Sequence, residues 1–366
     1  MTTATQMYAL SSQEMAQGIA AGGHLRSVLV EGPIGIGKTY LQRVLAKMLP
    51  THTPVYFDCS TKDLGDITIP DIMHMDDGTG FVRYVTNEEL GAHHDKPIIL
   101  MIDELGKCNP AVLLSLLRVI LERKIGSYTL HPESIVFCTT NLGAEGVGDI
   151  LPAHARNRIT VAEMAKPTWD QWIEWGLANG IDHTLLGWCR NNEKAFADFR
   201  DFSDPEANDY IHHPRSTRTA FVTPRSLEAA SDWMKLYAGG KFSDKVLTSY
   251  LMGTIGTAAT GDLMAFTRLA DQMPTIDSIK DDPQNALIPT SVGGVMMVVY
   301  KVLASLEREW VDAWMVYMDR LSKEAQGVFI NATRVPDYPK QKLLSRNRKF
   351  TDWCVANQYL FTADVQ

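Results

Sequence analysis

The sequence lacks the features that mark secreted, zinc-binding and membrane-spanning proteins. Its five cysteines are an odd number and form no C-x-x-C pair, which argues against a disulfide framework or a zinc site and favours a reducing compartment. Residues Met1–Thr5 show no basic end followed by an apolar run, so we expect no secretory signal. The most apolar segment, Val295–Tyr300, is interrupted by Lys301, well short of the roughly 20 residues of a membrane span. We therefore expect a soluble, cytoplasmic protein without membrane contact.

An excess of basic charge is also missing. The chain has 35 lysines and arginines against 43 aspartates and glutamates, so its net charge is −8. This balance does not favour a general nucleic-acid coat and leaves room only for a local basic patch. The sequence contains no internal repeat and no low-complexity segment. Its 366 residues suggest two or three domains, and a hydrophobic content of 45% argues for a sizeable core and against disorder.

The strongest motif is Gly32–Thr39, which has the phosphate-loop spacing G-x-x-x-x-G-K-T. It follows the apolar run Val28–Val30 and leads into Tyr40–Leu45, so the pattern predicts a strand, a glycine-rich loop and a helix. Backbone N–H groups of such a loop and the helix N-terminus bind phosphate. A chance glycine-rich turn is the alternative, but the flanking elements favour a nucleotide site. The expected nucleotide-binding residues here are Gly32, Pro33, Ile34, Gly35, Ile36, Gly37, Lys38, Thr39 and Tyr40.

Two predicted buried strands end in polar side chains. Ile98–Glu104 ends in two carboxylates, and ligands of open α/β sheets bind at the carboxyl edge of the strands. Asp103 is expected to hold Mg²⁺ through water, together with the Thr39 hydroxyl, and Glu104 to polarise the attacking water. A strand that merely ends in charge is the alternative. Ser134–Asn141 is the second strand, and Asn141 is either a residue that orients water or touches the γ-phosphate, or a turn former.

The remaining pattern predicts further short elements and then a mostly helical second half. The expected strands are Leu25–Glu31, Val55–Cys59, Phe81–Val85 and Ile159–Val161. The expected helices are Gln13–Ala21, one to about Met48, a short one capped by Thr86 with Glu89, one from Asn109 and Pro110 to Gly126, one from Thr223 to about Tyr237, and a long one over Leu303–Leu321. Four tryptophans, at 169, 172, 175 and 188, are expected in the core rather than as a base-stacking platform.

Several basic residues have two interpretations. Arg156 and Arg158 are either a solvated pair or phosphate sensors supplied to a neighbouring subunit. Arg225 lies in the first turn of a predicted helix, where its charge opposes the helix dipole and suggests an anionic partner. Arg215 and Arg218 are expected to be solvated. The basic tail, Lys340–Lys349, is either a solvated helix face or a contact for a polyanion or partner.

Taken in order, these motifs resemble an AAA+ ATPase, most closely the MoxR-type group with its CbbQ, NorQ and GvpN branches. The residues that carry the resemblance are Gly32–Thr39, Ile98–Glu104, Thr140–Asn141, Leu151–Arg158 and Thr223–Glu228, together with the MoxR-like segments Cys59–Leu64, Asp103–Pro110 and Glu122–Ile125. The resemblance covers about residues 15–235. Residues 240–366 are similar to a helical extension of phage or prophage-type relatives.

The resemblance implies an α/β fold and a role for each site residue. It implies a P-loop AAA+ core with a parallel sheet flanked by helices over residues 1–165. A helical lid over 166–240 and a helical C-terminal domain of unknown role over 241–366 would follow. The implied roles are Walker A for Lys38 and Thr39, Walker B for Asp103 and Glu104, sensor 1 for Asn141, arginine finger for Arg158 or alternatively Arg156, and sensor 2 for Arg225.

The resemblance also implies a function. Members of the family hydrolyse ATP with Mg²⁺ and assemble into rings, usually hexamers. The loop around residues 78–85 would correspond to an insertion that lies near the central pore of these rings. A chaperone-like ATPase that remodels a partner, such as a von Willebrand A-domain protein, is the first expectation. A nucleic-acid-directed motor of phage replication or a restriction-type system is the second, supported only by the basic tail. An ATP-dependent assembly switch is the third.

Overall fold

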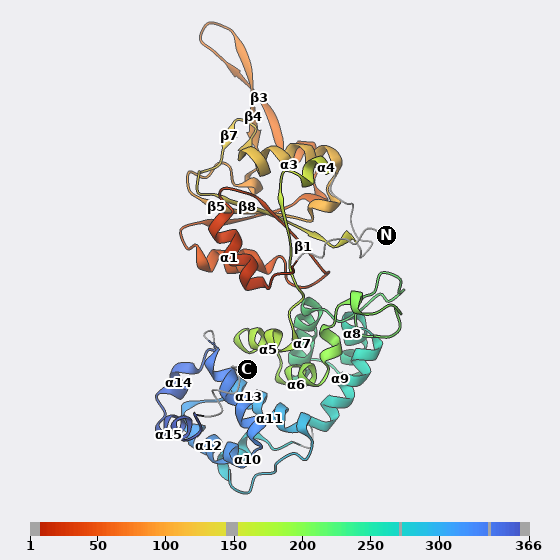
Figure 1. Ribbon diagram of the computed structural model, residues 1–366, viewed down its shortest axis with the longest axis vertical. Coiled ribbons are helices and arrows are strands. Elements are labelled where there is room, and N and C mark those ends of the chain that lie inside the picture. Colours follow the sequence, from red (N-terminus) through yellow and green to blue (C-terminus); the bar gives the residue numbers. More distant parts are fainter. Residues whose placement is uncertain (1–7, 144–152, 271–272, 336–337, 359–366) are drawn as a thin grey trace. The chain divides into compact units, whose positions relative to one another are not determined.

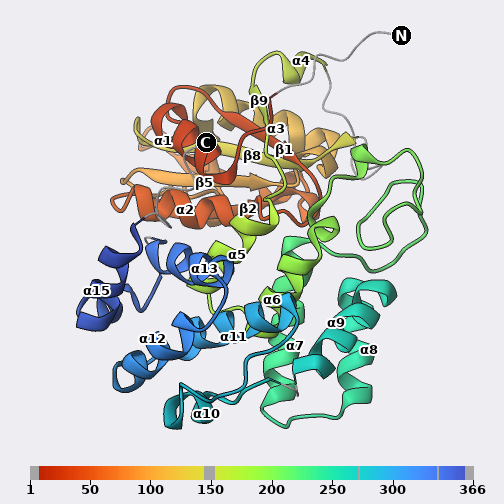
Figure 2. The same ribbon diagram turned by 60° about the horizontal axis from the view of Figure 1, so that its bottom comes forward.

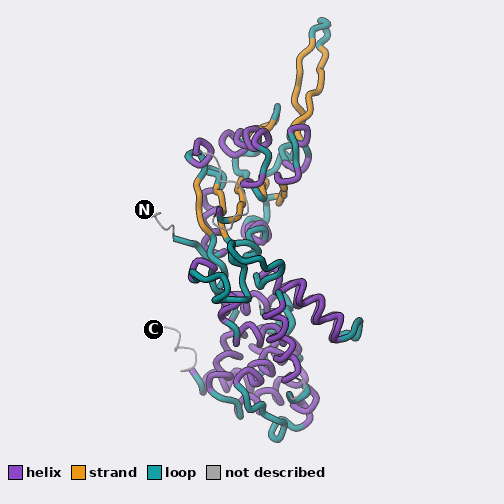
Figure 3. Tube along the Cα trace, turned by 90° about the vertical axis from the view of Figure 1, so that its right-hand side faces the viewer, coloured by secondary structure: helices purple, strands orange, loops and turns teal. Residues whose placement is uncertain are grey.

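The chain forms two compact units in the computed structural model, which describes residues 8–143, 153–270, 273–335 and 338–358 (Figure 1). The first unit spans Met1–Lys166 and the second spans Pro167–Gln366. The first holds a parallel sheet flanked by helices, and the described part of the second is helical (Figure 3). This arrangement confirms the predicted fold class. A division of the second unit at residue 240 into a lid and a C-terminal domain stays a prediction.

Five parallel strands form the main sheet of the N-terminal unit, in the order β2-β5-β8-β1-β9. The strands are β1 (Val28–Gly32), β2 (Thr53–Asp58), β5 (Ile98–Asp103), β8 (Ile135–Asn141) and β9 (Thr160–Glu163), and the helices of this unit are α1 (Ser12–Gly22), α2 (Tyr40–Met48), α3 (Pro110–Glu122) and α4 (Ala153–Arg156). Because all five strands run the same way, their carboxyl ends lie at one edge of the sheet.

The sheet is buried on both faces, as a parallel sheet with helical connections requires. Along β5, Leu100 and Ile102 pack in one cluster with α3, whereas Ile99 and Met101 pack in another with α1 and α2. Strand side chains alternate between faces, so an unbroken apolar run is what two covered faces need. Figures 1 and 2 show α3 and α2 on opposite sides of the sheet.

Local capping residues set the starts of the first helices. Ser11 and Glu14 form a capping box at the start of α1, and Asn109 caps α3 with Pro110 at its first position. Thr39 precedes α2 without a side-chain cap, because its hydroxyl is directed at Asp103. The expected start of α3 is confirmed. Its expected end at Gly126 is wrong, since the helix ends at Glu122.

Arg123 ends α3 in the left-handed conformation, with φ of 59°. Its guanidinium donates to the backbone oxygens of Gly23 at 2.8 Å and Ile120 at 2.6 Å and to the Ser27 hydroxyl. It therefore ties the end of α3 to the segment between α1 and β1, rather than acting only as a charge at a helix terminus. The chain then turns through the short pair β6 (Lys124–Ile125) and β7 (Tyr128–Thr129).

A two-stranded antiparallel hairpin, β3 (Thr68–His74) with β4 (Gly80–Thr86), projects from the N-terminal unit (Figure 3). The sequence pattern predicts β4 and misses β3. The predicted cap at Thr86 is wrong, because Thr86 ends β4 and Asn87 caps a single 3-10 turn, Glu88–Leu90. The Asn87 side chain accepts a hydrogen bond from Glu89 N at 3.0 Å, so it satisfies one of the backbone amides at the start of that turn.

The C-terminal unit is built from helices around one continuous core. The described helices are α5 (Trp169–Ala178), α6 (His183–Asn191), α7 (Pro224–Ala238), α8 (Asp244–Ile255), α9 (Thr257–Ala270), α10 (Ile276–Asp281), α11 (Val292–Ser305), α12 (Val311–Asp319), α13 (Lys323–Arg334), α14 (Gln341–Ser345) and α15 (Arg348–Ala356). Trp172 and Trp188 are buried in this core, and Trp169 and Trp175 pack against it, which confirms their predicted role. Across the described residues, no helix is both long and apolar enough to cross a bilayer.

The predicted single helix over Leu303–Leu321 is wrong. The chain leaves the helical conformation at Leu306 and Glu307, and α12 begins at Val311 after a 3-10 turn. The apolar side is predicted correctly, since Leu306, Trp310 and Trp314 are all buried. The break lets α11 pack against α6 and α13 while α12 packs against α10 and α15. Tertiary packing therefore overrides a continuous helical pattern here.

Two predictions about basic side chains also change. Arg218 is not solvated, because its guanidinium donates to the backbone oxygens of Pro205, Asn208 and Ile211 and pairs with Glu206. In the basic tail, Lys340 donates to the Ala304 oxygen, and burial lowers the pKa of its ammonium. The tail also contains two ion pairs, Arg348–Asp352 at 3.7 Å and Lys349–Asp312 at 3.6 Å. These two pairs lie on the surface, so only the bond of Lys340 to a backbone oxygen withdraws a charge of the tail from a polyanion.

Replacing Arg123 tests whether its guanidinium holds the N-terminal unit together. We expect Arg123→Ala to lower the free energy of unfolding by about 2–3 kcal/mol, because charge-assisted bonds to buried carbonyl oxygens are lost. Arg123→Gly should recover about 1 kcal/mol of that loss, since glycine adopts the left-handed conformation without strain. Urea denaturation, with hydrogen exchange of the β8 amides to follow this unit, measures both.

The matched control is Arg118→Ala on the same helix, where an exposed ion pair joins Arg118 to Glu122. Surface pairs of this kind contribute about 0.5 kcal/mol. A loss in Arg123→Ala no larger than that of the control would contradict the structural role of Arg123.

Candidate nucleotide site

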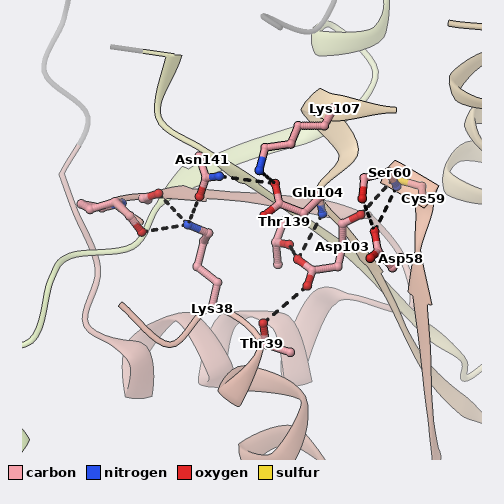
Figure 4. Close-up of polar contacts among 12 residues, drawn as sticks. Lys38, Thr39, Asp58, Cys59, Ser60, Asp103, Glu104, Lys107, Thr139 and Asn141 are labelled. Carbon is pink, nitrogen blue, oxygen red and sulfur yellow. Dashed lines mark hydrogen bonds and ion pairs between the residues drawn. The ribbon is translucent and has the colours of Figure 1, made fainter. Parts of the chain in front are cut away.

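The predicted site residues of the core meet at the carboxyl edge of the main sheet (Figure 4). Gly32, Asp103 and Asn141 end β1, β5 and β8, three neighbouring strands. Strand register places Gly32 beside Asn141 and Asp58 beside Asp103. Residues separated by more than a hundred positions in the sequence therefore form one row of polar groups.

The loop that follows β1 has the backbone conformation that its glycines predict. Gly35 and Gly37 have φ of 70° and 97°, which is the left-handed region that favours glycine. At Gly32, an added Cβ would lie 2.8 Å from Ile36 Cδ1 and 2.9 Å from the Met164 oxygen. Any side chain at Gly32 would therefore displace the loop. Buried Ile36 fixes the loop onto the core.

Lys38 is buried at the centre of the loop, with 8% of its surface exposed. Its ammonium donates to the backbone oxygens of Gly32 at 2.7 Å and Pro33 at 2.9 Å, and to Asn141 Oδ1 at 2.8 Å. These three acceptors hold a charge that would otherwise be costly to bury. They also hold the side chain inside the loop whose amides are the candidate phosphate ligands.

Thr39 and Asp103 bring two hard oxygen atoms together. The Thr39 hydroxyl donates to Asp103 Oδ2 at 3.4 Å across the start of α2. Within the described ranges, no group of three or more histidine, cysteine, aspartate or glutamate side chains is placed to hold a metal ion. A hydroxyl and one carboxylate still suit Mg²⁺, because this ion usually takes one or two carboxylates and completes its shell with phosphate and water. The donor set therefore fits the expected cation.

Glu104 occupies a strained backbone position next to Asp103. Its φ is 57°, in the left-handed region where a non-glycine residue costs on the order of 1 kcal/mol. Its carboxylate forms an ion pair with Lys107 at 3.0 Å and accepts from Asn141 Nδ2 at 3.3 Å. Asn141 thus lies between Lys38 and Glu104 and contacts both.

The two arginines of the predicted finger differ in their contacts. Arg156, at the end of α4, pairs with Glu31 of β1 at 2.8 Å. Arg158 is exposed, and its guanidinium has no hydrogen-bond or ion-pair partner among the residues that the structure describes. Leu151 and Pro152, which begin this motif, lie outside the described residues. Arg225 belongs to the other unit, where it is exposed in the first turn of α7, and its predicted role stays untested.

The structure adds three residues that the sequence patterns do not single out. The Thr139 hydroxyl donates to Asp103 Oδ1, the Tyr56 hydroxyl donates to Asp103 Oδ2, and Lys107 pairs with Glu104. Burial, and then the charge of Asp103, raise the pKa of Tyr56, so its hydroxyl stays protonated at neutral pH. One sequence signal could have identified Tyr56. It lies two residues before Asp58 on a predicted strand, and residues two apart on a strand point to the same face of the sheet.

Comparison with protein families gives a match over residues 27–134, to the AAA domain of the dynein-related subfamily. The matched region includes the phosphate loop and the strand that ends at Asp103. All of the matched residues lie within the N-terminal unit. This finding agrees with the sheet order and with the loop described above. A comparison with curated proteins found no match.

Several solved structures match the chain at low identity. RuvB from Thermotoga maritima, a Holliday junction branch migration motor, is 16% identical over 75% of each chain, with a TM-score of 0.34. NtrX from Brucella abortus is 15% identical over 65% of this chain and 53% of its own, with a TM-score of 0.36. A putative ATPase from Cytophaga hutchinsonii is 14% identical over 71% of this chain and 90% of its own, with a TM-score of 0.32.

Substitution of Lys38 tests whether this edge binds nucleotide. We expect Lys38→Ala to weaken binding of a fluorescent ATP analogue by about 10- to 100-fold, because a charge-assisted bond to phosphate is lost. Equilibrium titration of the full chain measures the affinity. Lys47→Ala, at the exposed end of α2, is the control and should bind like the wild type. Equal affinities of Lys38→Ala and the wild type would argue against a phosphate site here.

Proposed function

We propose that the chain is a Mg²⁺-dependent ATPase that hydrolyses ATP to ADP and phosphate. The observation that carries the proposal is the convergence of two sets at one sheet edge. The first is a pair of oxygen ligands suited to a cation, the Thr39 hydroxyl and the Asp103 carboxylate. The second is a hydrogen-bonded chain of side chains that runs from Lys38 through Asn141 to Glu104. The AAA domain match over residues 27–134, which include Lys38, Thr39, Asp103 and Glu104, supports the same chemistry.

Lys38 and Asn141 would position the phosphate chain. The ammonium of Lys38 lies within reach of three oxygen acceptors, so a phosphate oxygen can replace one of them without leaving the charge unpaired. Release of Asn141 Oδ1 by Lys38 would free the amide of Asn141 to orient a water molecule or contact the γ-phosphate. Mg²⁺, when bound beside Thr39 and Asp103, supplies charge neutralisation for the β- and γ-phosphates.

Glu104 is the candidate general base of the reaction. Its carboxylate would accept a proton from the attacking water while Asn141 holds that water in line. The ion pair with Lys107 limits the motion of this carboxylate. Catalysis of this kind depends on positioning and charge stabilisation rather than on covalent chemistry.

We further propose a ring, hexameric by family resemblance, in which Arg158 completes the site of the next subunit. Arg158 is favoured over Arg156 because Arg156 already pairs with Glu31 of its own β1. An exposed guanidinium can reach a phosphate on another copy, where such a finger contributes about 10³–10⁵ in rate. Arg225 remains the candidate for sensing nucleotide from the helical unit.

For the biological role we propose MoxR-type remodelling or activation of a partner protein, such as a von Willebrand A-domain protein. The acidic net charge supports a protein partner over a polynucleotide. So does the bond of Lys340 to the Ala304 oxygen, which withdraws one charge of the basic tail that a nucleic-acid-directed motor would use. The hypotheses of a phage origin and of an ATP-dependent assembly switch rest on the sequence resemblance alone.

Replacing Glu104, the proposed base, tests both ATP hydrolysis and binding of a protein partner. We expect Glu104→Gln to bind ATP with wild-type affinity but to lower turnover by at least about 10²-fold, because the amide accepts no proton. Steady-state phosphate release measures turnover. The same variant, immobilised with ATP, should recover a protein partner, and it should release that protein when ATP is removed.

Three results would change the assignment. Full turnover in Glu104→Gln would contradict the proposed base. Recovery of nucleic acid alone, with salt-sensitive binding lost on neutralising Lys342 and Arg346, would favour the nucleic-acid motor. Full biological activity of Glu104→Gln would favour the assembly switch over remodelling.

Mixing variants tests whether Arg158 acts on a neighbouring copy. Arg158→Ala should lower turnover by about 10³-fold or more while ATP affinity holds. Mixed with Glu104→Gln, it should regain part of the activity, because some interfaces then combine an intact Glu104 with an intact Arg158. Arg156→Ala should instead lower stability through the loss of its pair with Glu31. An inactive mixture, or loss of turnover only in Arg156→Ala, would rule out Arg158 as the finger.

A further inference from the structure

Tyr56 is a polar residue on the edge strand β2 that the phosphate-loop and Walker B patterns do not contain. Its hydroxyl donates to Asp103 Oδ2 at 3.0 Å. In the strand register Tyr56 lies beside Met101, two residues before Asp103 on β5. Residues two apart on a strand share a face, so the contact runs diagonally between neighbouring strands on the side of α2.

This hydroxyl completes the hydrogen bonds of the Asp103 carboxylate. Oδ1 accepts from the Thr139 hydroxyl and from Glu104 N, the latter at 3.1 Å. Oδ2 accepts from Tyr56 at 3.0 Å and from Thr39 at 3.4 Å. An ionised carboxylate has about four lone-pair sites, so these four donors fix its rotation. Tyr56 supplies the shorter bond on the oxygen that faces Thr39.

The position of the Tyr56 ring is itself fixed by the fold. Its neighbours Val55 and Phe57 are buried at 8% and 0% exposure on the opposite face of the strand, whereas Tyr56 is 44% exposed. Gln42 Nε2 donates to the Val55 oxygen at 2.7 Å and ties β2 to α2, the helix that begins next to Thr39. The phenol therefore reaches Asp103 from a fixed strand with only two rotatable bonds.

We propose that Tyr56 is a positioning residue of the magnesium site, which holds Asp103 Oδ2 in the orientation that faces the Thr39 hydroxyl. The proposal rests on the Mg²⁺-nucleotide site proposed above. Tyr56 acts through Asp103 and not on the nucleotide, so its removal should weaken the effect of Mg²⁺ and leave metal-free binding intact. When a residue that orients a metal-binding side chain is removed, metal affinity typically falls by about 10- to 100-fold.

The test is Tyr56→Phe in the full chain, which removes only the hydroxyl. Equilibrium binding of a fluorescent, non-hydrolysable ATP analogue is measured in EDTA and across a Mg²⁺ titration. The Mg²⁺ concentration for half-maximal tightening of binding should rise on the order of 10-fold, and the affinity in EDTA should not change. Tyr250→Phe is the matched control, because Tyr250 is similarly exposed at 46% and lies in the other unit.

Two outcomes overturn the proposal. An unchanged Mg²⁺ dependence in Tyr56→Phe means that the hydroxyl does not orient Asp103 for the metal. Equal weakening with and without Mg²⁺ means that it contacts nucleotide or supports the fold, and thermal unfolding separates those two causes. The binding assay needs no turnover. A wild-type chain that binds with Mg²⁺ but hydrolyses nothing would therefore remove the proposed ATPase and leave the Tyr56 result valid.

Discussion

The four hydrogen bonds of the Asp103 carboxylate hold the site of this protein together. They join β5 to β8 through Thr139, to β2 through Tyr56 and to the start of α2 through Thr39. Parallel pairing puts the ends of these strands at one edge, and the carboxylate then fixes how the polar groups at that edge face one another. This one side chain therefore links the start of α2, next to the phosphate loop, to the end of β5.

A row of charges at a buried edge is tolerated because each member has a partner. Lys38 is satisfied by two loop carbonyls and Asn141, Glu104 by Lys107 and Asn141, and Arg156 by Glu31. Within this row, Glu104 has a strained, left-handed backbone, and it lies directly beside the proposed reaction centre. Backbone strain concentrated at one functional residue is a common feature of active sites. The apolar strands behind this edge supply the rigidity that such positioning requires.

The C-terminal unit is organised around an apolar core rather than a row of polar groups. Its core is large and continuous, and helices from the beginning and end of the unit pack into it together. Arg218 and Lys340 turn inward to bond backbone oxygens, so sequence position alone is a poor guide to which charges are available to a partner. The hairpin β3–β4, by contrast, exposes apolar side chains, among them Ile72 at 66% and Phe81 at 52%.

Features that depend on neighbouring residues could be predicted from the amino-acid sequence. The phosphate loop needs glycine at fixed spacing, α3 needs Asn109 and Pro110 at its start, and β5 needs an apolar run that ends in acid. Each of these is local chemistry that a sequence pattern records. Three other features come from long-range packing: Tyr56 and Thr139 share Asp103, Arg123 reaches Gly23, and the helical pattern breaks at Leu306. Those features join residues far apart in the chain, or depend on which helices compete for a core, and no local pattern encodes such contacts.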